Sequence, residues 1–272
     1  MRLWYILKIL FKKVLKKIVP RKIILGLRGS IGRIYYFGNR FFCPCCGGHL
    51  RKMKPFEGLF YINGKQIDYY TENSICPICS SDIRHRFLLT FLKNNTNILK
   101  TELRLLHFAP EEGISRFFKK LKNIDYVPCD IDPSGYPGAL KVDITHMQFA
   151  SNSFGGVLAS HVLEHVKDDL GAIKEIYRIV ESGGWALIAI PVYGESTFED
   201  LSLDYSGREK MYGIGCHMRM NGLDFRLKLS EAGFHVNVFS LDDAPGSYFD
   251  RSANSPHIDT DKYLFFCNKV MT

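Results

Sequence analysis

Five of the chain's eight cysteines lie between Cys43 and Cys79, and their spacing is typical of a metal site. They form two turns, Cys43-Pro-Cys45-Cys46 and Cys76-Pro-Ile-Cys79. Each CxxC turn can aim two thiolates at one point, and two such turns complete the tetrahedral shell that Zn²⁺ prefers. Clustered cysteines of this kind favour a metal over a disulfide framework. We predict a structural Zn²⁺ bound by Cys43, Cys46, Cys76 and Cys79, since four thiolates leave no open position for water.

The segment between the two cysteine turns, LFYINGKQIDYY, is typical of a β-hairpin with Asn63 and Gly64 at its turn. The whole arrangement therefore resembles a zinc ribbon. Cys45 is predicted to be a non-ligand, because Cys43 and Cys46 have the better spacing. His85, just after the second turn, is an alternative ligand, although its place in the sequence RHR favours a surface position.

From Leu103 onward, apolar runs alternate with amphipathic segments. This alternation predicts a parallel sheet with helices on both faces, and ligands of such sheets bind at the carboxyl ends of the strands. The predicted strands are 103–108, 124–129, 141–143, 155–160, 185–190, 236–239 and 263–267, and the predicted helices are 114–121, 168–179 and 223–232.

Three of the predicted strands end in polar residues that suit a nucleoside. Asp130 closes IDYVPCD, where an acid at the end of the second strand can accept both hydrogen bonds of a ribose diol. Asp143 in KVDITHMQF could hold the exocyclic amine of an adenine, and Ser160-His161 opens SHVLEHV. Each aspartate alone is also explained as a turn or helix cap. Their order along one sheet favours a binding site.

Several stretches between Leu103 and about Phe239 carry a family resemblance. The chain resembles a class I S-adenosylmethionine-dependent methyltransferase of the type 11-like group, in a bacterial subgroup with an Ala-Pro-Glu first loop behind a cysteine module. The resemblance implies a Rossmann-like, seven-stranded, mostly parallel sheet with helices on both faces and S-adenosylmethionine as cofactor. The similar stretches are LLHFAPEEG, YVPCDIDP, KVDITHMQFASNSFGGVLASHVLEHV, IYRIVESGGWALIAIPV and GIGCHMRMNGLDFRLKLSEAGFHV.

The resemblance also implies roles for individual residues at the cofactor site. A glycine-rich first loop would be usual, but this chain has Gly113 alone behind Ala109, Pro110 and Glu111. These four residues would form the loop under the methionine part of the cofactor, with Glu111 accepting from its ammonium group. The other implied contacts are Asp130 on the ribose with Asp132 as a competitor, Asp143 and Ile144 around the adenine, His161 beside the transferred methyl group, and Ser160 before it.

Methyl transfer from a sulfonium depends mainly on alignment, because the positive charge dissipates in the transition state. An oxygen or nitrogen acceptor must still lose a proton. Imidazole titrates near neutral pH, so His217, His161 and His165 are candidate bases, with His217 the leading one. Arg219 is predicted to hold a carboxylate or phosphate of the acceptor. A site without a side-chain base is the alternative.

The first 22 residues predict a basic amphipathic helix that Pro20 ends. Apolar residues including Trp4 and Phe11 share one face, and five lysines lie opposite. This pattern favours a helix lying in an anionic membrane interface through residues 3–19, and the alternative is packing on the protein itself or on a second subunit. The segment is too charged to span a bilayer, and it lacks the small-residue cleavage site of a signal peptide.

Charge is distributed unevenly along the chain, with 19 Lys/Arg against 4 Asp/Glu up to Lys100 and 17 against 24 beyond it. A basic front half suits contact with phosphate, from lipid or RNA. We expect three parts, at 1–22, 23–100 and 101–272. The predicted activity is methylation of a small molecule or an envelope sugar or lipid-linked intermediate, in the cytoplasm or peripherally on the inner membrane face. The alternatives are an RNA methyltransferase and a non-catalytic binding protein.

Overall fold

A computed structural model describes residues 34–62, 65–243 and 260–271 of the chain. The predicted amphipathic helix of residues 1–22 and the predicted turn at Asn63 and Gly64 lie outside these ranges. Within them, no helix is both long and apolar enough to cross a membrane.

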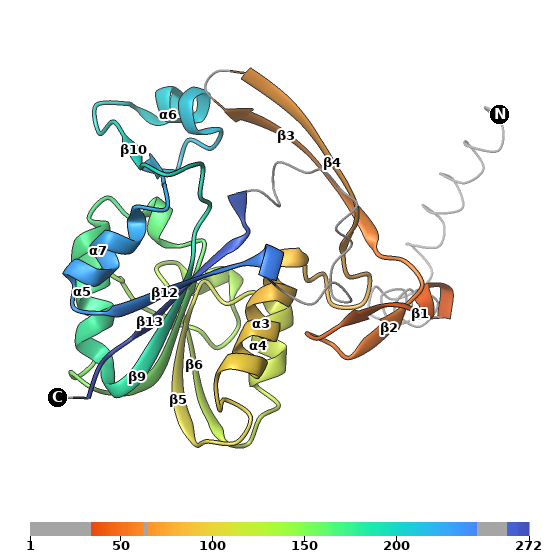
Figure 1. Cartoon of the computed structure of the whole chain (residues 1–272), viewed down its shortest axis with the longest axis horizontal. Helices are drawn as coiled ribbons and strands as arrows, with labels where there is room; N and C mark the ends of the chain where they lie inside the picture. Colours follow the sequence, from red (N-terminus) through yellow and green to blue (C-terminus); the bar gives the residue numbers. More distant parts are fainter. Residues whose placement is uncertain (1–33, 63–64, 244–259, 272) are drawn as a thin grey trace.

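The cysteine module consists of two antiparallel strand pairs. Strands β1 (Phe37–Cys43) and β2 (Gly48–Leu50) flank the first cysteine turn. Strands β3 (Lys54–Ile62) and β4 (Lys65–Ile75) form the predicted hairpin, with Ile62 paired to Lys65 across its end. The hairpin extends from the cysteine turns across the molecule toward α6 (Tyr205–Tyr212), which β3 contacts (Figure 1).

A seven-stranded sheet follows the cysteine module and has the order β12-β13-β9-β8-β5-β6-β7. Its central strands pair in parallel, and β13 lies antiparallel between β9 and β12. This confirms the predicted Rossmann-like, mostly parallel sheet. The strands are β5 (Leu103–Phe108), β6 (Ile124–Asp130), β7 (Leu140–Lys141), β8 (Phe154–Ser160), β9 (Val180–Ala189), β12 (His235–Ser240) and β13 (Tyr263–Asn268).

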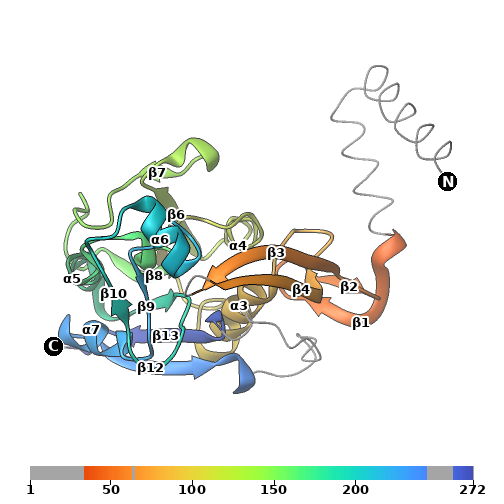
Figure 2. The ribbon, with the colours of Figure 1, turned by 90° about the horizontal axis from the view of Figure 1, so that it is seen from above.

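Helices cover both faces of the sheet (Figures 1 and 2). Because successive side chains of a strand point to opposite faces, neighbouring strand residues enter different cores. Leu105 packs in the core that contains residues of α3 and α4, whereas Leu106 packs in the core that contains residues of α5 and α7. The helices are α3 (Ile83–Asn95), α4 (Glu112–Phe118), α5 (Asp169–Ile179) and α7 (Phe225–Glu231).

One apolar core connects the cysteine module to the sheet. Cys43 and Cys76, both fully buried, belong to the same cluster as Leu88 of α3, Phe118 of α4 and Leu158 of β8. The boundary at residue 100 stays a prediction, and the core extends across it. Both cysteine turns therefore belong to the apolar core on the side of the sheet that α3 and α4 cover.

The chain between β9 and α7 contains elements that were not predicted. They are α6 and the short antiparallel pair β10 (Phe198–Glu199) and β11 (Arg219–Met220). Strand β9 also begins at Val180, five residues earlier than predicted. The Glu-Ser-Gly-Gly stretch, which looks like a turn in the sequence, belongs to the strand. Its Glu and Ser are exposed, and Gly183 has a positive φ of 80°.

Candidate functional site

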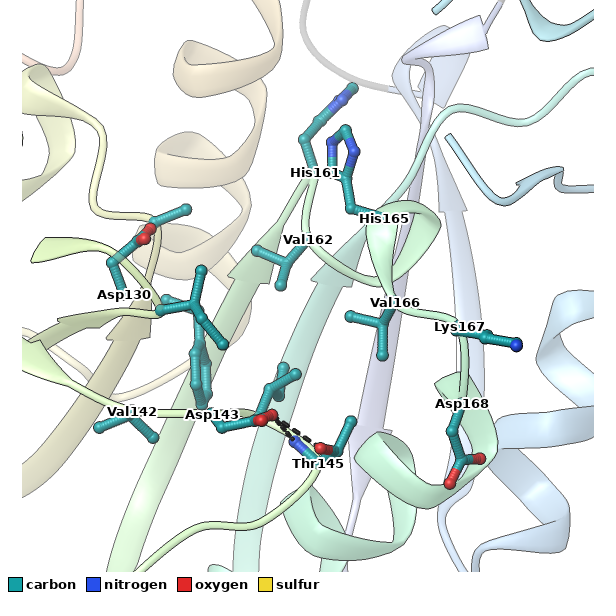
Figure 3. Close-up of a pocket in the computed structure, with 14 residues that line it drawn as sticks. Asp130, Val142, Asp143, Thr145, His161, Val162, His165, Val166, Lys167 and Asp168 are labelled. Atoms are coloured by element: carbon teal, nitrogen blue, oxygen red, sulfur yellow. Dashed lines mark hydrogen bonds between the residues drawn. The ribbon is translucent and has the colours of Figure 1, made fainter. Parts of the chain in front are cut away.

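A cavity of about 540 Å³ lies at the carboxyl ends of β5, β6, β7 and β8 (Figure 3). Volumes of this order are usual for small-molecule and cofactor sites. Five of the predicted cofactor contacts line it, and they come from the ends of four separate strands of the sheet. They are Ala109, Asp130, Asp143, Ile144 and His161.

Two cavity residues, Ala109 and His161, have left-handed backbone conformations, with φ of 46° and 54°. This conformation costs a non-glycine residue about 1–2 kcal/mol and often marks functional sites. Backbone hydrogen bonds hold both residues in place, from Ala109 N to Cys129 O at 2.9 Å and from His161 N to Ala189 O at 2.8 Å. Ala109 thus takes, at some cost in strain, a conformation that glycine would adopt freely.

The two aspartates differ from the competing Asp132 in their surroundings. Asp130 Oδ1 accepts from the backbone N–H of Asp132 at 2.8 Å, and Asp130 lines the cavity. The Asp132 carboxylate instead caps a short 3₁₀ turn by accepting from Ser134 N at 3.1 Å, and it is absent from the cavity wall. The geometry favours Asp130 for a ligand in the cavity.

Asp143 is held as an anion at the cavity wall. Its Oδ1 accepts from the Thr145 hydroxyl at 2.7 Å and from the Thr145 backbone N–H at 2.9 Å (Figure 3). These two hydrogen bonds lower the pKa of Asp143. The carboxylate can therefore only accept hydrogen bonds near neutral pH, which suits an amino group on the ligand.

Glu111 does not face this cavity. Pro110 and Glu111 line a second cavity of about 460 Å³ with residues of α4 and the loop after β6. One carboxylate oxygen of Glu111 lies 2.9 Å from His107 Nε2, and the other lies 3.5 Å from His85 Nε2 on α3. Glu111 thus contacts two buried imidazoles in place of the predicted ammonium group of the cofactor.

Burial opposes ionisation of Glu111, but the hydrogen bond with His107 and the nearby imidazole of His85 outweigh it and keep the pKa of Glu111 well below its usual value. A lowered folded-state pKa contributes stability above the unfolded pKa of about 4.3, and this contribution is lost as the pH falls. We expect Glu111→Gln to lower the free energy of unfolding by about 2 kcal/mol at pH 7, with the difference shrinking below about pH 4. Urea unfolding at several pH values measures both quantities.

The adjacent Glu112 provides a matched control. Its side chain is 73% exposed and pairs with Arg116 on the surface of α4. Glu112→Gln should change the stability by less than about 0.5 kcal/mol at every pH. Equal effects of the two substitutions would contradict the buried histidine–glutamate contact.

Gly113 and Ser160 also lie away from the cavity wall. A Cβ on Gly113 would lie 3.5 Å from Ser81 Cβ and 3.6 Å from Cys79 O, so this residue faces the cysteine module. Ser160 is buried at the end of β8. Both therefore position the chain around the cavity rather than line it.

His161 is the predicted base that lines the cavity together with His165. Its Nδ1 lies 3.1 Å from Glu164 Oε1, and its Nε2 lies 3.5 Å from Asp261 Oδ1. Burial and the charge of Arg84 oppose its protonation, but the carboxylates of Asp261 and Glu164 outweigh them and raise the pKa of His161. Asp261 was missed by sequence reasoning, because one hundred residues separate it from His161.

His217, the leading predicted base, is 4% exposed and does not line the cavity. Its ring packs edge-to-face on His165 with ring centroids 4.8 Å apart. Burial lowers the pKa of His217 to about 4. Its imidazole is therefore neutral at physiological pH, but the ring has no direct access to an acceptor in the cavity.

Arg219 is 1% exposed and its guanidinium is fully engaged inside the protein. It donates to the backbone carbonyls of Leu163, Val166 and Lys167 and to the Glu199 carboxylate. The predicted contact with an acidic acceptor does not fit this position. Arg219 instead clamps the turn that follows β8.

The four predicted zinc ligands come together in the cysteine module. The sulfurs of Cys43, Cys46, Cys76 and Cys79 all lie within 4.8 Å of one another, with Cys43 to Cys79 at 3.7 Å and Cys46 to Cys76 at 3.8 Å. Tetrahedral zinc with Zn–S bonds of about 2.3 Å separates neighbouring sulfurs by about 3.8 Å. The residues therefore fit Zn²⁺.

The two remaining candidates in the module are not part of this cluster. Cys45 is buried outside it, and its role as a non-ligand stays a prediction. His85 accepts from the Asp82 backbone N–H at the start of α3 and contacts Glu111. It is 9% exposed, so the predicted surface position of His85 is wrong: it joins α3 to the loop after β5.

Known methyltransferases are similar to this chain in sequence or in fold. Residues 113–188 match the family model of a methyltransferase domain. A protein of Galdieria sulphuraria assigned as a sarcosine dimethylglycine methyltransferase superposes with a TM-score of 0.50 at 15% identity, over 71% of this chain and 88% of that chain. No curated protein matches at a significant level.

Two further solved structures are similar at TM-scores of 0.47. A SAM-dependent methyltransferase from Archaeoglobus fulgidus is 14% identical over 68% of this chain and 94% of its own. Phosphoethanolamine N-methyltransferase 2 of Haemonchus contortus, in complex with S-adenosyl-L-methionine, is 16% identical over 68% of this chain and 52% of its own.

Proposed function

We propose that this chain, whose residues 113–188 match a methyltransferase domain, is an S-adenosylmethionine-dependent methyltransferase that acts on a small molecule, or on an envelope sugar or lipid-linked intermediate at the cytoplasmic face of a membrane. The observation that supports this proposal is the convergence of Ala109, Asp130, Asp143 and His161 on one cavity at the carboxyl ends of the strands. The basic amphipathic pattern of residues 3–19 is the reason for placing the acceptor near a membrane.

The cavity offers groups suited to each part of the cofactor. Asp130 would accept hydrogen bonds from the ribose hydroxyls, and Asp143 would accept from the adenine amine while Ile144 packs on the ring. The left-handed turn at Ala109 would let the backbone approach the methionine part. S-adenosylmethionine, when bound, supplies an electrophilic methyl group on a sulfonium. His161 lies on the same wall; its neutral form could take a proton from the acceptor, and the carboxylates of Glu164 and Asp261 would stabilise the imidazolium that results.

Calorimetric titration with S-adenosylmethionine tests the proposal. The wild-type protein should bind one equivalent, and Asp130→Ala should weaken binding about 30- to 100-fold. Loss of two hydrogen bonds to a charged acceptor accounts for about 2–3 kcal/mol. Asp132→Ala is the matched control, because Asp132 lies two residues away but caps a turn, and it should bind within about threefold of the wild type.

The outcomes also separate the alternatives. Absence of heat from the wild-type protein would support the non-catalytic alternative and contradict the enzyme. Equal losses for Asp130→Ala and Asp132→Ala would contradict the proposed ribose contact. Salt-dependent binding to bulk RNA that survives deletion of residues 1–22 would favour an RNA acceptor.

A further inference from the structure

We propose that Glu164, His165 and His217 bind a divalent transition-metal ion at the wall of the cofactor cavity. Each of the three residues offers one ligand atom, and these atoms all lie within 4.8 Å of one another. Glu164 and His165 belong to the turn after β8, and His217 approaches from the loop before β11. Two imidazoles and one carboxylate are a common ligand set for Fe²⁺, Mn²⁺, Co²⁺ or Zn²⁺.

The contact with His161 explains only part of the burial of this group. Glu164 is 0% exposed, and neither of its carboxylate oxygens accepts a hydrogen bond. The 3.1 Å approach of His161 Nδ1 to Glu164 Oε1 is an ion-pair contact only. His217 is 4% exposed and its Nδ1 also has no hydrogen-bond partner. A buried carboxylate without donors is costly, and a bound cation would offset that cost.

The surrounding contacts hold the ligands in a fixed arrangement. His165 Nδ1 lies 3.3 Å from the backbone carbonyl of Cys216, which suits an N–H donor and leaves Nε2 available as a ligand. The backbone N–H of Met218 donates to Glu164 O at 2.8 Å. Arg219 donates to the carbonyls on both sides of the turn, at Leu163, Val166 and Lys167. Outer contacts of this kind orient metal ligands and tune their affinity.

The position of the cluster connects it with the proposed methyl transfer, and this step rests on the proposed function. His165 lines the cofactor cavity and turns toward it beside His161 (Figure 3). Three protein ligands leave coordination positions open. His165 is the ligand that lines the cavity, so an oxygen atom of the acceptor could occupy an open position on that side, where a bound cation would lower the pKa of a coordinated hydroxyl. The acceptor class we infer is therefore a hydroxyl compound.

Equilibrium dialysis against Co²⁺ tests the metal site directly. The protein is first loaded with one Zn²⁺, so that the cysteine cluster is filled, and is then dialysed and analysed for both metals. We expect one Co²⁺ per chain in addition to the zinc. His217→Ala and Glu164→Gln should each weaken Co²⁺ binding at least tenfold, whereas His235→Ala, at an exposed position on β12, should not change it.

A separate measurement keeps the result interpretable. His165→Ala should also lose Co²⁺. Titration with S-adenosylmethionine reports whether each variant keeps its fold and its cofactor site. A wild-type protein that binds the cofactor but no Co²⁺ would overturn this proposal and leave the methyltransferase intact. Unchanged Co²⁺ binding in all three variants would overturn it as well.

Discussion

Replacing Cys76 by serine, or stripping the cysteine cluster of metal, should abolish S-adenosylmethionine binding although no cysteine of the cluster lines the cavity. Cys76 is fully buried in the core shared by α3, α4 and the sheet. A structural zinc site contributes directly to folding free energy, about 10–16 kcal/mol in small zinc modules. Loss of the metal would leave four cysteine thiols packed together with no ion to coordinate them.

The effect should reach the cofactor cavity through the loop that follows β5. A Cβ added to Gly113, at the start of α4, would be in van der Waals contact with Ser81 and with the Cys79 carbonyl. Gly113 therefore lies next to the second cysteine turn. Arg86 on α3 holds the second cysteine turn by donating to the carbonyls of Ser74 at 2.8 Å and Ser81 at 3.0 Å. The start of α4, which follows the loop at Ala109, would therefore lose the surface on which it packs.

The measurement combines metal analysis, thermal unfolding and cofactor calorimetry on Cys76→Ser and on chelator-treated wild-type protein. We expect a loss of about 4 kcal/mol or more in stability and at least a 100-fold loss in cofactor affinity. Cys216→Ser is the control, because Cys216 is exposed and outside the cluster, and it should behave as the wild type. Metal-free protein that still binds S-adenosylmethionine at wild-type affinity would refute this coupling.

Patterns within single strands and turns allowed much of this fold to be predicted. β5 coincides with its predicted range, and the paired CxxC turns identified the cysteine cluster. Both signals are local, because a strand buried on two faces reads as a continuous apolar run and a CxxC turn defines its own geometry. Asp130 and Asp143 were predictable for a similar reason: Asp130 is the last residue of β6, and Asp143 lies two residues after β7.

The residues whose position was not predicted depend on contacts between distant parts of the chain. Glu111 turns away from the cavity toward His85, which belongs to α3 and lies 26 positions earlier. Nothing in HFAPEEG itself indicates that partner. His217 and Arg219 lie in a polar-looking stretch, yet both are almost fully buried. Their burial follows from the packing of β11 against the turn after β8, which no local periodicity reveals.

Arg219→Ala should lower the free energy of unfolding by about 3–5 kcal/mol, which is more than the same substitution of a surface arginine would cost. Its guanidinium is 1% exposed and lies 2.6 Å from Glu199 Oε1 and 3.4 Å from Asp169 Oδ2. It also donates to three backbone carbonyls in the turn 163–167. Truncation would leave the buried carboxylate of Asp169 to its contact with Lys228 at 2.7 Å, and it would remove the guanidinium donors from all three carbonyls.

Urea unfolding of Arg219→Ala, Arg219→Lys and Arg226→Ala shows whether Arg219 stabilises the turn through its hydrogen bonds or through its charge alone. A lysine keeps the charge but cannot donate to three carbonyls and a carboxylate at once, so Arg219→Lys should recover less than half of the loss. Arg226 is exposed on α7, and its replacement should cost less than about 0.5 kcal/mol. Because Val166 and Lys167 line the cavity, the clamp variants should also bind S-adenosylmethionine more weakly. Full recovery in Arg219→Lys would show that charge alone, rather than the forked set of hydrogen bonds, holds the turn.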